Sequence, residues 1–167
     1  HIEHITSFYS VEKDNYYWRW LIRADFSDSA GESRLGNFSF REKKISVSSN
    51  AQLISSLLVT GFPYNITENP MNCVEHFQNF LFEAQAVRRL GSAALDLCYV
   101  ACGRFDGFWE VALNPWDMAA GGLLVEEAGG IISDFHGEAH SIYKKEIVAS
   151  NKNIHKEMLC VLRKRIK

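Results

Sequence analysis

The sequence predicts an α/β fold, a layered α/β/α sandwich-like domain in which strands alternate with helices. Two dipeptides, Asn69-Pro70 and Asn114-Pro115, are typical of helix starts, because asparagine suits the N-cap and proline suits the first helical position. A short apolar run at 56–60 ends at Gly61 and is typical of a buried strand. With 47% hydrophobic residues among 167, the chain is long and apolar enough to build a core.

Composition and charge narrow the function classes. The formal net charge is −2 and no basic stripe is present, so we set nucleic-acid binding aside. No apolar run reaches the roughly 18 residues of a membrane span, and no signal peptide is visible at the start. We therefore expect a cytoplasmic protein without a membrane partner. The chain also lacks an initiating methionine, which is typical of a fragment or a processed product.

The four cysteines do not form a Cys-x-x-Cys pair. Cys98 and Cys102 are four residues apart on an expected helix and could share a face, but no further ligands with zinc spacing accompany them. We prefer to interpret them as small buried thiols in a reducing compartment. His136 and His140 are also four apart, but Gly137 and the polar neighbours predict a turn with both imidazoles at the surface.

Residues 1–50 form a poorly legible N-terminal segment, expected to hold strands and a loop, and residues 51–167 form the α/β domain. Within the N-terminal segment, residues 16–22 have strand propensity. Residues 25–34 are polar, contain Gly31 and predict a loop.

The first half of the α/β domain is expected to continue from the strand at 56–60 into a helix that opens at Asn69-Pro70 and ends near Ala86. Four apolar residues recur at helical spacing in this helix and are expected to face the core: Val74, Phe77, Leu81 and Ala84. A strand at 87–90, a helix at 93–102 closed by Gly103, and a strand at 105–111 follow.

The helix that begins at Asn114-Pro115 is expected to run to about Ala128, where Gly129 can take the left-handed conformation. Small residues at 119–122 leave one face almost without side chains, and each glycine in a helix costs roughly 1 kcal/mol relative to alanine. The close approach of another backbone or of a ligand would offset that cost. Strands at 131–133 and 146–149 follow, and Ser150 or Asn151 is expected to cap a C-terminal helix that ends in cations at 163–165.

Asp117 falls in the first turn of the helix that starts at Asn114, and two interpretations of it are open. It could simply cap the helix, because unpaired N–H groups and the helix dipole favour negative charge there. It could instead bind a metal, since a carboxylate oxygen suits a hard cation such as Mg²⁺ and both Asp106 and Glu110 lie just upstream.

A second informative stretch covers residues 88–95. Gly91 lies at a strand-to-helix turn, where backbone N–H groups at a helix N-terminus form a ready site for an anion or a hydroxyl. The alternative is an ordinary turn in which Ser92 acts as the helix cap. The local sequence does not decide between them.

Two motifs give the chain a resemblance to a known family. Residues 116–121 (Trp-Asp-Met-Ala-Ala-Gly) and 126–130 (Glu-Glu-Ala-Gly-Gly) resemble the C-terminal signature of the inositol monophosphatase family, which belongs to the Mg²⁺-dependent, lithium-sensitive phosphatases. Gly91-Ser92-Ala93 matches the family's Gly-Ser/Thr-Ala loop, and residues 95–107 continue the match. Residues 36–48 faintly resemble the family's glycine-rich hairpin. The resemblance implies that residues 50–165 have the fold of the C-terminal half of an inositol monophosphatase.

The resemblance also implies roles for individual residues. Gly91, Ser92 and Ala93 would contact a sugar-like substrate, Glu110 would bind one of its hydroxyls, and Asp117 would bind a catalytic Mg²⁺. No residue of the chain is assigned to the chemical step itself.

Three neighbours of these motifs receive structural interpretations instead. Trp116 is expected to pack beside the metal ligand, whereas Glu126 and Glu127 are expected to lie on a solvated helix face.

The chain departs from the family at one important point. The family's other signature, Asp-Pro-x-Asp-Gly-Thr, is absent from the 167 residues, as is the glutamate upstream that supports it. Those residues supply most of the metal ligands and activate the attacking water. The chain therefore looks like the C-terminal half of such an enzyme, and we expect it to be weakly active or inactive alone.

Two functions from different classes follow. The first is a Mg²⁺-dependent phosphatase that hydrolyses a phosphate monoester of inositol or of a similar polyol or sugar. The alternative is a non-catalytic truncated or decayed homologue that keeps the fold and binds a partner. A nucleotide-binding enzyme is disfavoured because the sequence contains neither Gly-x-Gly-x-x-Gly nor a P-loop. Family members are commonly homodimers, but the sequence identifies no interface.

Overall fold

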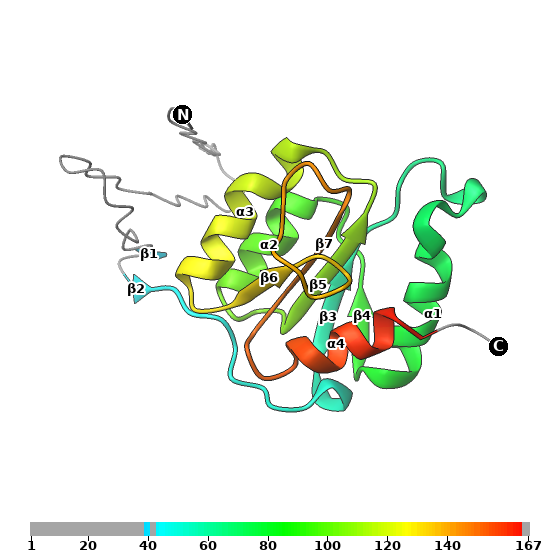
Figure 1. Cartoon of the computed structure of the whole chain (residues 1–167). Coiled ribbons are helices and arrows are strands. Elements are labelled where there is room, and N and C mark those ends of the chain that lie inside the picture. The colour runs from blue at the N-terminus through cyan, green and yellow to red at the C-terminus, as the bar shows by residue number, and fades with distance from the viewer. Residues whose placement is uncertain (1–38, 41–42, 165–167) are drawn as a thin grey trace, which may run out of the picture. The chain divides into compact units, whose positions relative to one another are not determined.

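The structure, a computed structural model, describes residues 39–40 and 43–164 (Figure 1). The chain divides into two units, His1–Ile45 and Ser46–Lys167. In the first unit, strands β1 (Ser39–Phe40) and β2 (Lys43–Lys44) pair antiparallel, within the hairpin expected at 36–48. The expected strand at 16–22 and loop at 25–34 lie outside the described residues.

The second unit is built on a five-stranded mixed sheet with the order β4-β3-β5-β7-β6. The strands are β3 (Leu57–Thr60), β4 (Ala86–Arg88), β5 (Gly107–Val111), β6 (Ile131–Ser133) and β7 (Glu146–Ser150). Strand β3 pairs parallel with both β4 and β5, whereas β7 pairs antiparallel with β5 and β6. Strand β5 lies in the middle of the sheet. Its first three residues pair with β3, and β7 pairs with it along its whole length to Val111.

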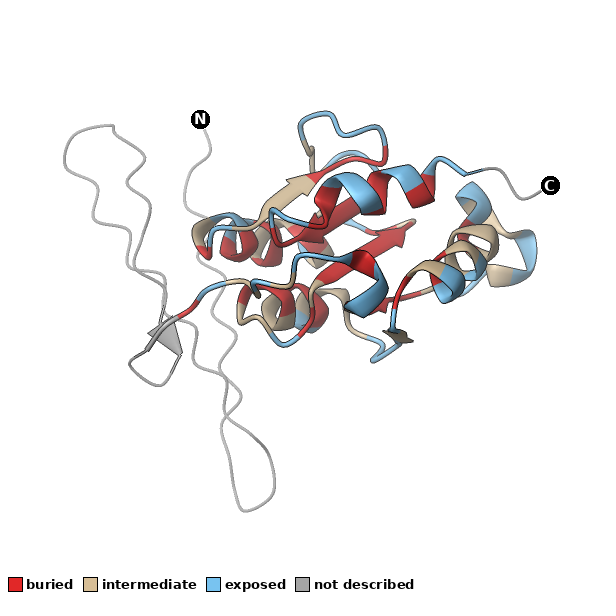
Figure 2. Ribbon diagram, turned by 90° about the horizontal axis from the view of Figure 1, so that it is seen from below, coloured by how far each residue is buried: buried red, intermediate tan, exposed pale blue. Residues whose placement is uncertain are grey.

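In the described part of this unit, four α-helices cover the sheet: α1 (Cys73–Glu83), α2 (Ala93–Ala101), α3 (Pro115–Glu127) and α4 (His155–Leu162). Short 3₁₀ turns lie at Leu53–Ser55, Ile66–Glu68 and Pro70–Asn72. Helices α2 and α3 pack against each other and on the sheet, and α1 and α4 form a second pair against it. In Figure 2 the buried strands lie between these helical layers. The predicted α/β/α class is therefore confirmed.

Strand β5 alternates between the two layers, as a pleated strand must. Trp109 faces α1, where its ring stacks on Phe80 with centroids 3.9 Å apart. Val111 belongs to the same hydrophobic cluster. Phe108 and Glu110 therefore face the opposite layer of α2 and α3.

The helix predicted at Asn114-Pro115 is confirmed as α3. Its first residue is Pro115, its C-cap is Ala128, and Gly129 takes a φ of +85° just beyond the end. A Cβ added at Gly121 would lie 2.6 Å from the Cβ of Leu97 in α2. The small residues of α3 thus permit the close approach of α2. This close packing offsets the cost of placing glycines inside a helix.

Helix α1 differs from its prediction at both ends. A turn at 69–72 with positive φ at Asn69 (47°) and Met71 (53°) interrupts the expected start, so the α-helix begins only at Cys73. The Asn69 side chain still contributes to the start, because its Oδ1 accepts a hydrogen bond from the N–H of Val74 at 3.0 Å. The helix ends at Glu83 because β4 already begins at Ala86.

The predicted core face of α1 is partly wrong. Ala84 is buried, and Val74 and Phe77 pack against the core, but Leu81 is 51% exposed. Phe80 takes the buried place instead, because it is the residue whose ring meets Trp109.

The C-terminal helix differs from its prediction at both ends. Its N-cap is Ile154 and not Ser150 or Asn151. Asn151 instead holds the turn before the helix, since its Oδ1 accepts hydrogen bonds from the N–H groups of Asn153 (2.9 Å) and Ile154 (3.1 Å). The helix ends at Leu162, so Arg163 follows its last turn, and the Arg163 guanidinium donates to the carbonyls of Phe135 and His136. The prediction that the helix itself ends in cations is wrong.

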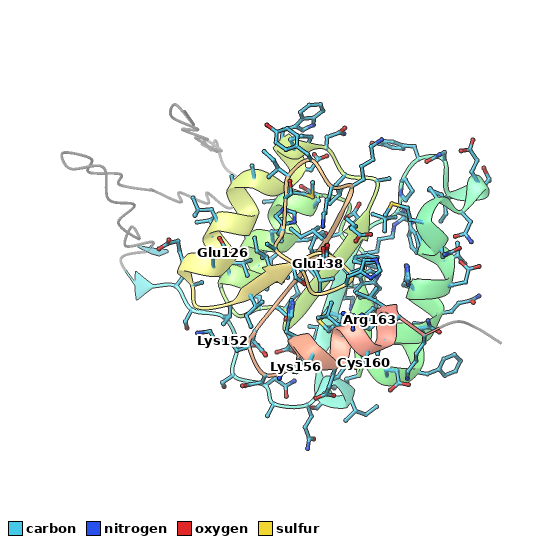
Figure 3. All side chains as sticks on the ribbon, in the orientation of Figure 1. Glu126, Glu138, Lys152, Lys156, Cys160 and Arg163 are labelled. Carbon is cyan, nitrogen blue, oxygen red and sulfur yellow. The ribbon has the colours of Figure 1, made fainter. Side chains whose placement is uncertain are left out.

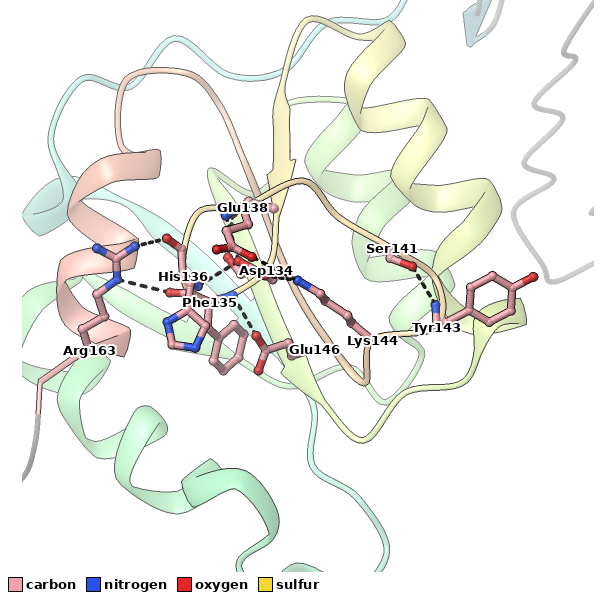
Figure 4. A network of polar contacts seen from close by, with 10 residues as sticks. Asp134, Phe135, His136, Glu138, Ser141, Tyr143, Lys144, Glu146 and Arg163 are labelled. Carbon is pink, nitrogen blue, oxygen red and sulfur yellow. Dashed lines mark hydrogen bonds and ion pairs between the residues drawn. The ribbon is translucent and has the colours of Figure 1, made fainter.

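The connection between β6 and β7 is organised by Asp134 (Figure 4). Its buried carboxylate accepts hydrogen bonds from the N–H groups of His136 (2.9 Å) and Glu138 (2.8 Å) and from Nζ of Lys144 (2.5 Å). His136 is exposed as expected, but His140 is half-buried and both of its ring nitrogens are inaccessible, so the surface prediction fails for that residue.

The buried His155 links α4 to strands β6 and β7. The His155 side chain is buried, and its two ring nitrogens hydrogen-bond to Oγ of Ser133 in β6 (2.9 Å) and Oγ of Ser150 in β7 (2.7 Å). Burial lowers the pKa of His155 to about 4, so the ring is neutral at physiological pH.

Candidate active site

The candidate site begins where β5 ends. Glu110 is the fourth residue of this strand and is only 9% exposed. Two residues later the backbone turns sharply, because Ala112 has a φ of +59° and its N–H donates to the carbonyl of Lys145 at 2.6 Å. This turn leads into α3, so the first turn of that helix follows closely after the end of β5 that carries Glu110.

Asp117 lies in the first turn of α3 and has the capping role that the sequence allowed. Its Oδ2 accepts a hydrogen bond from the N–H of Asn114 at 3.0 Å. The residue is nevertheless half-exposed, and among the described residues no partner occupies its other oxygen. Capping and metal binding therefore do not exclude each other, because one oxygen can serve each purpose.

A third carboxyl group, Asp96 in α2, was not singled out from the sequence. Its side chain is fully buried, and among the described residues neither of its oxygens has a hydrogen-bond partner. Buried polar groups are normally hydrogen-bonded, so such a pair of orphan oxygens is unusual. The signal in the sequence was that Asp96 is the single charged residue of an otherwise apolar helix.

The electrostatics show that these carboxyls share one neighbourhood. Burial, followed by the charges of Asp96 and Asp117, raises the pKa of Glu110 to about 8, while Arg89 acts in the opposite direction. Burial raises the pKa of Asp96 to about 7. Glu110 of β5 is therefore within electrostatic reach of Asp96 in α2, of Asp117 in α3 and of Arg89, and we call the three carboxyl groups the acidic cluster.

The turn before α2 lies beside this cluster. Gly91 has a φ of +90°, is exposed, and would have nothing within 4 Å of an added Cβ. Ser92 is the N-cap by backbone geometry, but its hydroxyl makes no capping hydrogen bond. The hydroxyl and the first N–H groups of α2, from Ala93 onward, are thus available to an external partner.

The remaining candidates have structural roles or lie in solvent. Asp106 is at the opposite end of β5, where its carboxylate accepts hydrogen bonds from Oγ of Ser48 (2.6 Å) and N–H of Leu57 (2.7 Å). Glu126 on α3 is exposed (Figure 3). Glu127 is half-exposed. Trp116 is 70% exposed, which contradicts the expectation that it packs.

The oxygen donors near Asp117 decide whether the described residues can hold Mg²⁺. The Asp117 carboxylate has the hard oxygen that Mg²⁺ prefers. However, no group of three or more His, Cys, Asp or Glu side chains is close enough to hold a metal ion within residues 39–40 and 43–164. The Asp117 carboxylate is thus a single hard oxygen donor, and the described residues do not form a Mg²⁺ site by themselves.

Two cysteines lie in α2 and at its C-cap. Cys98 and Cys102 of the α2 region are both half-buried, and burial raises the pKa of the Cys98 thiol to about 12. A thiol with so high a pKa stays protonated at neutral pH and is a poor nucleophile.

Comparison with known proteins decides the family. The model of the inositol monophosphatase family matches residues 21–167. The chain belongs to the inositol monophosphatase family. The resemblance seen in the two motifs is thereby confirmed, and it extends over most of the chain.

Individual relatives agree with this assignment. The chain is 47% identical over 116 residues to an inositol-1-monophosphatase of Synechocystis sp., covering 70% of this chain and 40% of that protein. It is 44% identical over 122 residues to the Nus factor SuhB of Pseudomonas aeruginosa, covering 72% of this chain and 45% of that protein. The solved inositol monophosphatase of Anabaena superposes with a TM-score of 0.72 at 38% identity, covering 86% of this chain and 54% of that one.

The relatives are longer than this chain. The chain spans about half the length of the inositol monophosphatases that it matches, and the part that it shares is the C-terminal one. Every helix in the described part of the chain is also too short or too polar to cross a bilayer.

Proposed function

We propose that this chain supplies the substrate-recognising part and one metal ligand of a Mg²⁺-dependent phosphatase that hydrolyses a phosphate monoester of inositol or a similar polyol. The observation that carries the proposal is the convergence of Glu110, Asp117 and Asp96 beside the helix N-terminus that follows Gly91. An exposed anion-binding turn next to acidic groups suits a ligand that has both a phosphate and several hydroxyls.

In this proposal Glu110 binds a hydroxyl of the polyol. Its raised pKa does not weaken the argument, because a carboxylate accepts a hydrogen bond from a hydroxyl and a carboxylic acid can also donate one. The Gly91-Ser92-Ala93 turn would orient the ring through the Ser92 hydroxyl and the free N–H groups of α2.

Asp117 would hold one Mg²⁺ through the oxygen that does not cap α3. When bound in such an enzyme, Mg²⁺ stabilises negative charge on phosphate oxygens and lowers the pKa of a bound water. The contribution of this chain is to fix the direction of the Asp117 carboxylate, which is held by its hydrogen bond to Asn114 at the start of a rigid helix.

A second candidate is a non-catalytic homologue that keeps the fold and binds a partner. It is favoured by one observation, the lack of Asp-Pro-x-Asp-Gly-Thr in the 167 residues. The two candidates differ in what happens when the missing motif is supplied.

The test is to reconstitute the enzyme from two parts. The chain is mixed with a separately expressed N-terminal half of a family member that carries the missing motif, and phosphate release from inositol 1-phosphate is measured with and without Mg²⁺. We expect Mg²⁺-dependent release, and we expect Asp117→Asn to abolish it, since a neutral amide is a poor ligand for Mg²⁺. Glu126→Gln is the matched control on the same helix, because this exposed carboxylate lies outside the site.

The result separates the candidates. If the mixture is well folded and yet releases no phosphate from any inositol, sugar or polyol ester, the phosphatase proposal is wrong and the non-catalytic candidate stands. If Asp117→Asn leaves the release unchanged, the enzyme survives but the metal assignment does not.

A further inference from the structure

The glycines of the second unit serve different purposes. Gly91, Gly103, Gly129 and Gly137 have positive φ, a conformation that other residues rarely adopt. Gly61, which follows β3, is not among them, so its backbone conformation alone does not require glycine. Another reason must account for the missing side chain.

The pairing of β3 with β5 supplies that reason. Thr60 is opposite Trp109 in this parallel pair, so the next residue, Gly61, comes level with Glu110. Because side chains alternate along a strand, position 61 faces the same layer as Val59, the layer of α2 and α3. Gly61 and Glu110 are therefore neighbours on one face of the sheet.

The geometry at this point leaves no space for a side chain. A Cβ added at Gly61 would lie 2.4 Å from both carboxyl oxygens of Glu110 and 2.5 Å from its Cδ, and these are its three nearest atoms. Real Cβ atoms essentially never approach another heavy atom within 3.0 Å. The Glu110 carboxyl occupies the volume that a side chain at position 61 would fill.

Glu110 has little freedom to make room. Its backbone is paired with Ile147 of β7, and its side chain is almost fully buried.

We propose that Gly61 is a positioning residue for substrate recognition, because its missing side chain lets the Glu110 carboxyl lie over the end of β3. The position of that carboxyl fixes which hydroxyl of a bound polyol it can reach. The inference rests on the proposed function, in which Glu110 binds a substrate hydroxyl. Any side chain at position 61 pushes the carboxyl away from its place.

The first test concerns geometry and needs no enzyme activity. Thermal unfolding is measured for the chain and for Gly61→Ala, Glu110→Ala and the double variant. We expect Gly61→Ala to lower the melting temperature by about 5 °C or more when Glu110 is present, because overpacking of a buried site is destabilising. In the Glu110→Ala background the same change should cost less than about 2 °C, since the clashing group is gone.

Gly122→Ala is the matched control. The nearest atom to a Cβ at Gly122 is Cδ1 of Ile132 at 3.3 Å, the end of a flexible side chain. Its effect should be small and should not depend on Glu110. Equal losses from Gly61→Ala in both backgrounds would overturn the inference. If Gly61→Ala does not fold at all, folding of the double variant supports the inference and its failure overturns it.

The second test uses the reconstituted enzyme and separates this inference from the proposed function. Gly61→Ala should raise KM for inositol 1-phosphate about tenfold, with kcat and the Mg²⁺ requirement changed much less. A raised KM in Glu110→Gln but not in Gly61→Ala overturns the positioning role alone. An unchanged KM in both variants, together with the coupling in melting temperature, overturns the substrate role of Glu110 and with it the role proposed for Gly61.

Discussion

The fold raises the pKa of Glu110 well above the ordinary value of a glutamate carboxyl. Its pKa of about 8 is the result of burial and of two neighbouring carboxyls, against which Arg89 gives only partial compensation. Arg89 is itself held in place, because its guanidinium lies 4.9 Å from the ring centroid of Phe62. A side chain in such an environment forms strong hydrogen bonds to a polyol, since little water competes for it.

Glu110→Gln in the reconstituted enzyme should impair polyol binding more than metal binding. The amide keeps the size of the carboxyl but replaces one of its oxygens with an NH₂ group that cannot accept a hydrogen bond, and a buried polar group left without its partner costs about 1–3 kcal/mol. We therefore expect KM for inositol 1-phosphate to rise by about 10- to 100-fold, while the Mg²⁺ concentration for half-maximal activity changes little. Substrate kinetics and a Mg²⁺ titration measure the two effects. A large loss of Mg²⁺ affinity with unchanged KM would contradict the assignment of Glu110.

At the scale of secondary-structure elements, His155 is the group that ties α4 to β6 and β7. Its ring is neutral in the folded chain because burial disfavours the charged form. The unfolded chain, in contrast, binds a proton at this residue near the ordinary histidine pKa of 6.5. Protons are thus taken up on unfolding between pH 6.5 and about 4, and acid lowers stability over that range.

We predict that the chain is less stable at pH 5 than at pH 7 because of His155. From the two pKa values, the loss in unfolding free energy due to this residue is about 2 kcal/mol. Urea unfolding at the two pH values measures it, and His155→Gln should remove this part of the difference. The exposed His136 provides the control, because His136→Gln should leave the difference as it is. An identical pH dependence in the chain and in His155→Gln would refute the prediction.

The elements that the sequence predicted well are those whose ends are coded locally. Helix α3 begins at Pro115 because proline fixes φ at a helical value, and it ends before Gly129 because glycine permits the positive φ found there. Helix α1 was less predictable, since the turn at 69–72 uses positive φ at non-glycine residues. Phe80 is buried in place of Leu81 because Trp109, 29 residues further along, selects it.

The site was predictable to the same extent. Glu110 and Asp117 could be singled out as candidates because they lie in motifs that are continuous in sequence. Asp96 and Gly61 were not singled out as site residues, since their significance depends on neighbours that only the fold provides. Gly61 in particular contacts the Glu110 carboxyl only through the pairing of β3 with β5.

On the scale of the whole molecule, the described part of the chain presents large apolar side chains near the site. Trp116 on α3 and Leu95 on α2 are 70% and 44% exposed, and Leu90 just before α2 is 52% exposed. Large exposed apolar side chains are typical of surfaces that contact another protein segment or a ligand. Their position beside the acidic cluster suits a fold that is shared with proteins about twice as long.

The isolated 167-residue chain should therefore hydrolyse phosphate esters at a rate close to background and should be poorly soluble. One carboxylate rarely holds Mg²⁺ without further ligands, and general-base assistance to the attacking water is typically worth about 100- to 10,000-fold. Phosphate release by the purified chain, with Mg²⁺ varied, measures the activity, and light scattering measures association. Robust Mg²⁺-dependent turnover by the chain alone would show that these residues suffice for catalysis.

The order of the sheet also has a consequence for synthesis. The central strand β5 needs β3, which precedes it by about 50 residues, and β7, which follows it by about 40. During translation β5 therefore leaves the ribosome with one edge unpaired, and it remains so until Ser150 has emerged. The carboxyl group of Glu110 can take its place beside Gly61 before Asp117 is made, because β3 and β5 both precede Asp117. In contrast, β5 is paired on both sides only after β7 has emerged.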